Sequence, residues 1–437
     1  MVPVLPAVAA AVIERFRMKK ISQKLSAASA VLLGMSSPLS AQSEPWLIDV
    51  GVMNFNEQDR NTGLELMLKG TRATDEGGSI SIAAEIDVIT GATPNGASSS
   101  DVPQVFTMAS GVGHYTVSAN ELPADDTHMD TRLALKTAIN DPINNDLTAD
   151  YNAQISMEFD YLSFAGGGAL SWDLNKQNTT LSAGLNAEYN RVHPVGNTTI
   201  PFAAMQPAGQ PPVRGVSAKS KIGQELSLGV SQVIDRSSLF QLRLTTSHFR
   251  GYMTDSYKIL SVVENEGSAT PGRTVAYLYE KRPASRIMNS LYLAYKKSYQ
   301  PGILDVSYRL FDDDWDIRSH TADVSFKFKR EKNYFVRPSL RLYQQSAAYF
   351  YRHSLVAGEP LPAFASAELR LGKFNATTIG LELGRDLGIG RKQSLSLEYY
   401  TQQGDSHPND AIGLQRQQDL FPTLRSWVIR YVLAFKW

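Results

Sequence analysis

The final stretch of the chain, WVIRYVLAFKW (residues 427–437), shows a period of two residues. Every second side chain from Trp427 to Trp437 is apolar or aromatic, whereas Arg430 and Lys436 fall on the opposite face. A period of two is that of a β-strand. An unbroken apolar face of this length, ending on an aromatic residue, suits a strand whose outer side contacts lipid.

The same alternation recurs along most of the chain. Leu181, Leu185 and Tyr189, for example, alternate with Ser182 and Glu188. Each run has roughly ten residues or more, which is enough for a tilted strand to cross a bilayer. We therefore predict sixteen strands, at residues 46–56, 62–73, 78–89, 130–140, 146–158, 161–174, 179–192, 221–233, 238–252, 287–299, 303–311, 317–329, 333–344, 374–386, 393–403 and 425–437.

The connections between these strands alternate in length. One set is short, and the other includes long segments near residues 90–129, 193–220, 253–286, 345–373 and 404–424. Short periplasmic turns and long extracellular loops are typical of outer-membrane barrels. Soluble β-sandwiches have shorter strands, and propellers show a sequence repeat that this chain lacks. The predicted fold class is therefore an all-β, transmembrane antiparallel β-barrel of about 16 strands.

The N-terminus has the pattern of a secretory signal peptide. Basic residues between Arg15 and Lys24 precede an apolar run from Leu25 to Met35 and a small-residue segment that ends at Ala41. This order predicts a signal peptide at residues 1–41, in which residues 1–17 are a non-structural extension if translation starts at Met18. Residues 42–437 then form a single barrel domain in the outer membrane of a Gram-negative envelope.

Composition excludes several classes of protein. The 43 Lys and Arg residues balance 43 Asp and Glu residues, so no basic footprint for nucleic acid exists. The absence of cysteine excludes disulfide scaffolds and thiolate metal sites. We expect no cofactor. The expected partners are outer-membrane lipid, the barrel assembly machinery and a small solute, and the sequence leaves the oligomeric state open.

Strand alternation also predicts which charged side chains line the lumen. In a pore these residues would set selectivity; alternatively they form neutralising pairs in a wet interior. The predicted lining includes Glu85, Asp87, Glu158, Arg243, Arg309, Arg337, Arg341, Glu382, Glu398 and Arg430, with Lys136, Glu188, Glu225, Asp305 and Asp323 on the same side of their strands.

Six loop-region segments resemble recurring segments of a large bacterial family. They are TGATPNGA (90–97), SYKILSVVE (256–264), YLYEKRPASR (277–286), DDDWDIRSHT (312–321), YQQSAAYFY (343–351) and GEPLPAFASA (358–367). That family is known only as a domain of unknown function and is taken to be an outer-membrane barrel. Its genes often stand beside those for an exported flavin transferase and a thioredoxin-like protein. The resemblance thus implies a link to envelope redox or flavoprotein systems.

Two kinds of loop chemistry stand out. Glu280, Arg282 and Arg286 place two guanidinium groups beside a carboxylate, which predicts either capture of an anionic ligand or a salt-bridged staple, and we favour the staple. Two acidic clusters are weak metal candidates, because neither has the spacing of a known metal loop. They comprise Asp312, Asp313 and Asp314 near His320, and Asp125, Asp126 and His128 near Asp130.

No enzyme motif is present in the sequence. There is no Gly-x-Ser-x-Gly elbow, phosphate loop or His-Glu-x-x-His, so we expect no enzymatic activity. The favoured function is a porin-like pore or a binding protein for a small solute. The first alternative is an accessory or assembly scaffold linked to exported redox or flavoprotein systems. A weaker alternative is a rim hydrolase that uses Asp312 with His320 or Asp125 with His128.

Overall fold

A computed structural model describes residues 44–109, 113–207, 209–211, 213–329, 333–388 and 390–437. The predicted signal peptide at residues 1–41 lies outside the described residues. In the part of the chain that is described, no helix is long and apolar enough to cross a membrane.

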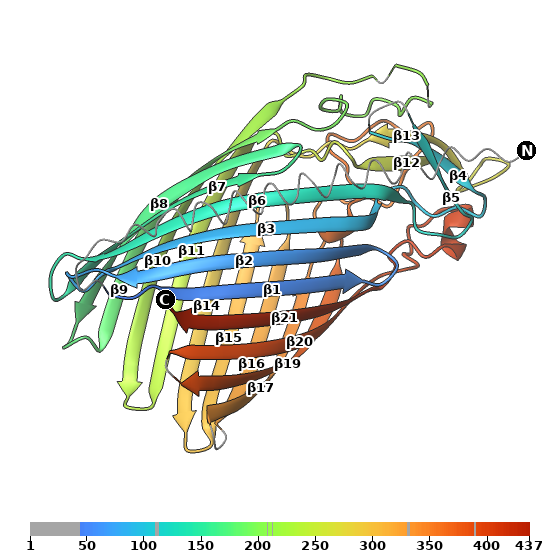
Figure 1. Ribbon diagram of the computed structural model, residues 1–437. Coiled ribbons are helices and arrows are strands. Elements are labelled where there is room, and N and C mark those ends of the chain that lie inside the picture. The colour runs from blue at the N-terminus through green and yellow to red at the C-terminus, as the bar shows by residue number, and fades with distance from the viewer. Residues whose placement is uncertain (1–43, 110–112, 208, 212, 330–332, 389) are drawn as a thin grey trace, which may run out of the picture.

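Sixteen antiparallel strands form a closed barrel (Figure 1). Closure is made by the first and last strands, where Leu47 pairs with Lys436 and Glu57 pairs with Ser426. In order around the barrel the strands are β1 (Leu47–Glu57), β2 (Asn61–Ala73), β3 (Ser79–Pro94), β6 (Ala124–Pro142), β7 (Leu147–Met157), β8 (Tyr161–Leu174), β9 (Thr179–Val192), β10 (Lys219–Asp235), β11 (Ser238–Gly251), β14 (Ser285–Tyr299), β15 (Gly302–Asp313), β16 (Arg318–Lys329), β17 (Tyr334–Gln345), β19 (Phe374–Gly388), β20 (Arg391–Gly404) and β21 (Leu424–Lys436).

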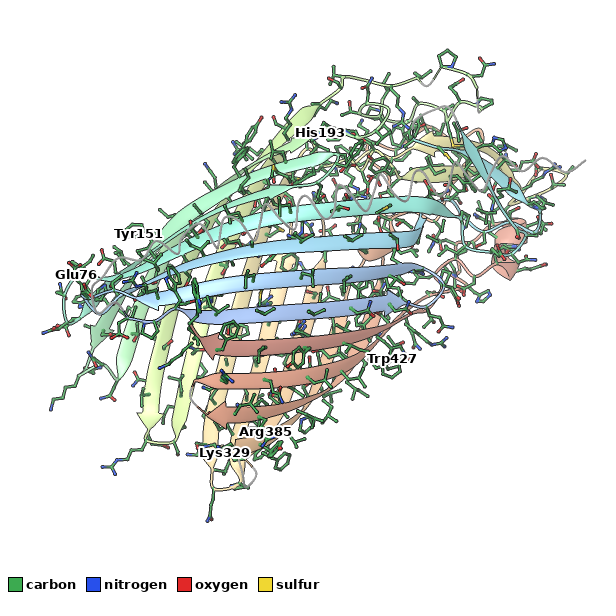
Figure 2. All side chains as sticks on the ribbon, viewed as in Figure 1. Glu76, Tyr151, His193, Lys329, Arg385 and Trp427 are labelled. Carbon is green, nitrogen blue, oxygen red and sulfur yellow. The ribbon has the colours of Figure 1, made fainter. Side chains whose placement is uncertain are left out.

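The two ends of the barrel differ. At one end, here called the turn end, β1 begins, β21 ends and short turns join the strands (Figure 1). The long connections gather at the opposite end, called the loop end. Figure 2 shows Glu76 and Lys329 at the turn end and His193 at the loop end. The length asymmetry predicted from the sequence is therefore present.

The two faces of the barrel wall have opposite polarity. Large apolar side chains are exposed on the outer face, including Leu185 at 65% and Ile429 at 47% exposure. Their neighbours Asn186 and Arg430 point to the other side of their strands, as the pleat requires. An apolar outer wall and a polar interior are typical of a barrel that spans a bilayer.

The long connections fold together into a cap, which consists of residues 95–109, 113–123, 193–207, 209–211, 213–218, 252–284, 346–373 and 405–423. Strand β12 pairs antiparallel with β13, and Val262 pairs in parallel with Leu355 of β18, 93 positions along the chain. The cap elements are the strands β4 (Gln104–Thr107), β5 (His114–Val117), β12 (Ile259–Val263), β13 (Thr274–Tyr279) and β18 (Leu355–Val356), and the 3-10 helices η2 (Leu369–Leu371) and η3 (Gly413–Gln417).

Buried apolar side chains concentrate at the loop end. One cluster surrounds Phe106 and Ile259, and a second surrounds Trp315 and Phe350. A third contains Leu260 and lies between β12 and β18. The cap thus has hydrophobic cores of its own, although the sequence-based prediction treated these segments only as loops.

The predicted fold class is confirmed, and most strand boundaries agree within two residues. The largest difference concerns β3 and β6, which extend five and six residues further toward the loop end than predicted. After a register shift at Gly91, Thr93 pairs with Asp125 and Pro94 with Ala124. This extension carries the hairpin beyond the barrel wall and into the cap.

Candidate functional site

The lumen contains a cavity of about 1150 Å³ along the wall formed by β14 to β21. Polar and charged side chains of both signs line it, and Arg370 of the cap contributes to its boundary. The charged lining residues are Glu57, Asp305, Arg309, Asp323, Arg337, Arg341, Arg370, Glu398 and Arg430. The cavity therefore brings together seven of the residues that strand alternation placed in the lumen.

The arginines near mid-height on β11 to β21 form what we call the basic arc: Arg243, Arg309, Arg341 and Arg430. Arg341 is neutralised by Asp323, with 2.5 Å between Nε and Oδ1. In contrast, Arg309 lies over the ring of Tyr292, and Arg430 donates to the sulfur of Met53.

Three members of the basic arc lack an acidic partner. Among the described residues, no carboxylate lies at ion-pair distance from Arg243, Arg309 or Arg430. Glu398, on the same wall, has no cation at that distance either. The basic arc therefore keeps positive charge that can act on a solute.

Carboxylates on β2 to β10 form a second group, called the acidic arc: Glu65, Glu85, Asp87, Glu188 and Glu225. Two of these are neutralised, because Lys136 contacts Glu85 at 2.6 Å and Arg132 contacts Asp87 at 2.6 Å.

The other three carboxylates have only neutral partners or none. Glu188 accepts a hydrogen bond from Asn190, and Glu225 accepts one from Ser247. Within the described part of the chain, no cation lies at ion-pair distance from Glu65, Glu188 or Glu225. Glu65 was missed in the sequence-based prediction, although its alternation with the exposed Leu64 would have indicated it.

Some predicted lining residues belong to neither arc. Arg337, which lines the cavity, forms an ion pair with Glu382 on the neighbouring strand. Glu158 lies one residue beyond the end of β7, at the loop-end rim, so it is not part of the mid-height lining. The sequence-based boundary at residue 158 placed it within the strand.

The predicted loop motif is distributed over two ion pairs. Glu280 is completely buried, and its Oε1 lies 2.6 Å from Nε of Arg282. Arg286 instead contacts Asp313 and lies over the ring of Trp315. Each guanidinium group thus already holds a carboxylate of this chain, which is the arrangement of a staple.

Further contacts join Glu280 to distant parts of the cap. Its carboxylate accepts hydrogen bonds from Ser366 Oγ at 2.5 Å and from the backbone N–H of Asp255 at 2.7 Å. Burial raises the pKa of Glu280, and the positive charge of Arg282 opposes this shift. Ser366 could not be found from the sequence, because 86 positions separate it from Glu280.

A second buried ion pair lies beside the first. Glu368 contacts Lys258 at 3.1 Å and Arg370 at 3.1 Å. Burial alone would raise the pKa of Glu368, but the two cations hold it well below its usual range. These contacts tie β12 to the segment that precedes β19.

The structure does not bring the first predicted metal cluster together. Asp312 pairs with Arg318, at 2.8 Å. Asp313 lies on the opposite face, where it holds Arg286 and accepts the N–H of Trp315. Asp314 accepts the N–H of Ile287. Consecutive strand residues point to alternate faces, so these three carboxylates do not converge.

The second predicted cluster lies on β6. Asp125 belongs to the part of β6 that extends into the cap, whereas the side chains of Asp126 and His128 lie outside the described residues. His320, proposed with Asp312 for the rim hydrolase, shares a hydrogen bond with Tyr308 at 2.7 Å, while Asp312 is paired elsewhere.

Three carboxylates do meet at the loop-end rim. Asp130, Glu158 and Asp160 have ligand atoms within 4.8 Å of one another. Burial and the negative charges of Asp130 and Asp160 raise the pKa of Glu158 to about 7. Tyr257 of the cap donates its hydroxyl to Asp160. Register between β6, β7 and β8 creates this group, which no short sequence motif encodes.

Residues 22–435 match the family model described as "Protein of unknown function (DUF3570)". The chain belongs to this family. The match confirms the resemblance inferred from the six segments, and the closed 16-strand barrel is consistent with an outer-membrane family. No curated protein matches the chain.

Several solved structures have a similar fold at low identity. A ferric enterobactin receptor (PfeA) variant from Pseudomonas aeruginosa gives a TM-score of 0.43 with 10% identity, covering 84% of this chain and 54% of that one. A siderophore receptor, PirA, from Acinetobacter baumannii gives a TM-score of 0.41 with 7% identity, and the match covers 84% of this chain and 54% of the receptor. A bacterial polysaccharide outer membrane secretin gives a TM-score of 0.44 with 8% identity, and the match covers 91% of this chain and 100% of the secretin. This DUF3570 chain spans about half the length of the siderophore receptors.

Proposed function

We propose that the protein is an outer-membrane barrel that passes a small polar solute through its lumen. The observation that carries this proposal is the cavity of about 1150 Å³, lined at mid-barrel by Arg309, Arg430 and Glu398. Barrels of about 16 strands are wide enough to enclose an aqueous channel. Charged groups without protein partners can interact with a solute and set selectivity.

The barrel wall supports placement in the outer membrane. Exposed apolar residues such as Leu185 and Leu397 cover the outer face, and aromatic residues such as Trp172 and Trp427 are exposed near strand ends. Aromatic side chains prefer the two membrane interfaces. In this orientation the turn end faces the periplasm and the cap faces outward.

Single-channel conductance in planar bilayers tests the proposal. We expect the folded, full-length protein to give stable open steps. Removing positive charge with the Arg309→Ala/Arg430→Ala variant should shift selectivity toward cations, because both arginines lack a carboxylate partner. The matched control is Arg318→Ala, whose guanidinium is exposed at the rim and paired with Asp312. A silent membrane that contains inserted protein would contradict passage.

A second candidate is a closed barrel that serves as a scaffold for envelope proteins. The folded cap, with its own cores and the fully buried Glu280, favours this alternative. A scaffold would give a silent bilayer in the same experiment. The function of a scaffold would not change on substitution of Arg309 and Arg430. It would be lost when the surface of the cap is altered.

A further inference from the structure

The two charged arcs lie on opposite sides of the lumen. In the barrel order, β10 is the eighth strand and β21 the sixteenth, so Glu225 and Arg430 stand half a circumference apart. The same separation relates β3, which carries Glu85, to β15, which carries Arg309. All four residues lie in the middle part of their strands. Negative and positive charge are therefore segregated across the barrel at one level.

Neutralising pairs do not remove this segregation. In the acidic arc, Lys136 and Arg132 neutralise Glu85 and Asp87. Among the described residues Glu65, Glu188 and Glu225 have no cation at ion-pair distance, and Lys221 interacts with Glu188 only at longer range. In the basic arc, Asp323 neutralises Arg341 only. Glu57 and Glu398 reduce the positive excess on this wall, but Arg243, Arg309 and Arg430 outnumber them. The residual charge thus has opposite sign on the two walls.

We propose that the lumen selects small zwitterions of the amino-acid and short-peptide class. This inference rests on the proposed passage of solutes. The carboxylate of such a solute would face the basic arc, and its ammonium group would face the acidic arc. A simple anion or cation gains attraction from one wall and repulsion from the other. A zwitterion gains attraction from both, because it can align with the field across the lumen.

Liposome swelling with two osmolytes of similar size tests this selection. L-Glutamine is the zwitterionic probe and L-arabinose is the neutral probe. For the full-length protein we expect glutamine to enter faster, by about tenfold, the lower end of what charge focusing provides. The preference should collapse in 1 M salt, where the Debye length falls to about 3 Å.

Two double variants remove one arc each without a large change in side-chain volume. Arg243→Gln/Arg309→Gln weakens the basic arc, and Glu188→Gln/Glu225→Gln weakens the acidic arc. Each should bring the glutamine-to-arabinose ratio close to one, because each removes the attraction for one end of the zwitterion. Arg318→Gln, outside the lumen, should keep the wild-type ratio. Heat-dependent mobility on gels verifies that every variant is folded.

The outcomes separate this inference from the proposed function. If arabinose enters and the glutamine-to-arabinose ratio is the same in wild type and both double variants, the inference of zwitterion selection is wrong, whereas the proposed passage of solutes is supported. If only the basic-arc variant changes the ratio, the lumen selects anions, and the role of the acidic arc is wrong. If neither osmolyte enters through inserted wild-type barrels, the proposed passage fails and selection fails with it.

Discussion

The carboxylate of Glu280 is fully buried in the cap and lies 2.6 Å from Nε of Arg282, its ion-pair partner. Ser366 completes the coordination of the same carboxylate from a segment 86 positions away. Two long connections, residues 252–284 and 346–373, are thus joined through one buried charge. Breaking such a pair leaves the remaining charge without compensation, which makes it a sensitive point of the cap.

Glu280→Ala should destabilise the cap by about 3–5 kcal/mol, because Arg282 would remain buried without its carboxylate. The barrel wall should stay intact, since its strands do not depend on this contact. We expect proteases to cleave the cap segments much faster in the variant while the heat-dependent gel mobility of the barrel is retained.

Two comparisons control this prediction. The exposed pair between Glu266 and Arg416 should contribute roughly 0–1 kcal/mol, so Glu266→Ala should leave cleavage near the wild-type rate. The Glu280→Met/Arg282→Met variant removes both charges and should be milder than Glu280→Ala. Equal cleavage of Glu280→Ala and Glu266→Ala would show that the pair does not hold the cap.

The barrel could be predicted from the sequence because its pattern is local. Each strand alternates within its own residues, as Leu181 to Tyr189 do in β9, and lipid on the outside requires that alternation in every strand. Because the interior is wet, charged residues such as Arg309 lie on the inner face of their strands, and the alternation of apolar and polar residues identifies that face in the sequence. Partner choice was not visible, because pairing of Arg341 with Asp323 depends on register between strands.

The cap could not be predicted, because its contacts join segments far apart in the chain. Pairing of β12 with β18 and burial of Glu280 beside Ser366 leave no short-range signal. The boundary of one strand also affects the first acidic cluster. The sequence predicts a strand at 303–311, but β15 continues to Asp313, so the side chains of Asp312 and Asp313 point to opposite faces.

A charge on the lipid side of the wall should be costly. Leu185 is 65% exposed on the outer face of β9, and the next residue, Asn186, faces the lumen. Leu185→Arg should destabilise the folded barrel by about 2–4 kcal/mol near the bilayer midplane. Asn186→Arg introduces the same charge on the wet side and should cost much less. Denaturant unfolding in lipid vesicles measures both, and equal costs would mean that the assigned faces are wrong.

Gly96 is required where the connection that follows β3 packs against β12. Its φ is +95°, and a Cβ there would lie 2.5 Å from the carbonyl oxygen of Ile259. Gly96→Ala should therefore cost more than the about 1–3 kcal/mol typical of backbone strain alone. Gly358→Ala is the matched control, because φ is +85° with nothing within 4 Å of the added atom. The Ile259 amide donates to the carbonyl oxygen of Asn95. Faster hydrogen exchange at this amide in Gly96→Ala than in Gly358→Ala would show the loss of local stability.

The carboxylates at the rim should make stability depend on pH. Burial and the charges of Asp130 and Asp160 raise the pKa of Glu158 to about 7, above its ordinary value of 4.5. The folded protein therefore binds this proton more tightly than the unfolded chain does. Its contribution to stability is fully present below pH 4.5, declines as the pH rises above that value and is lost as the pH passes through about 7.

Glu158→Gln should remove this dependence, because glutamine stays neutral. In detergent, the variant should melt at a higher temperature than wild type at pH 8.5 and at nearly the same temperature at pH 5. Asp130→Asn removes one of the charges that raise the pKa of Glu158, so it should reduce the wild-type pH dependence without abolishing it. A Glu158→Gln variant that differs from wild type by the same amount at both pH values would show that Glu158 ionises normally at the rim.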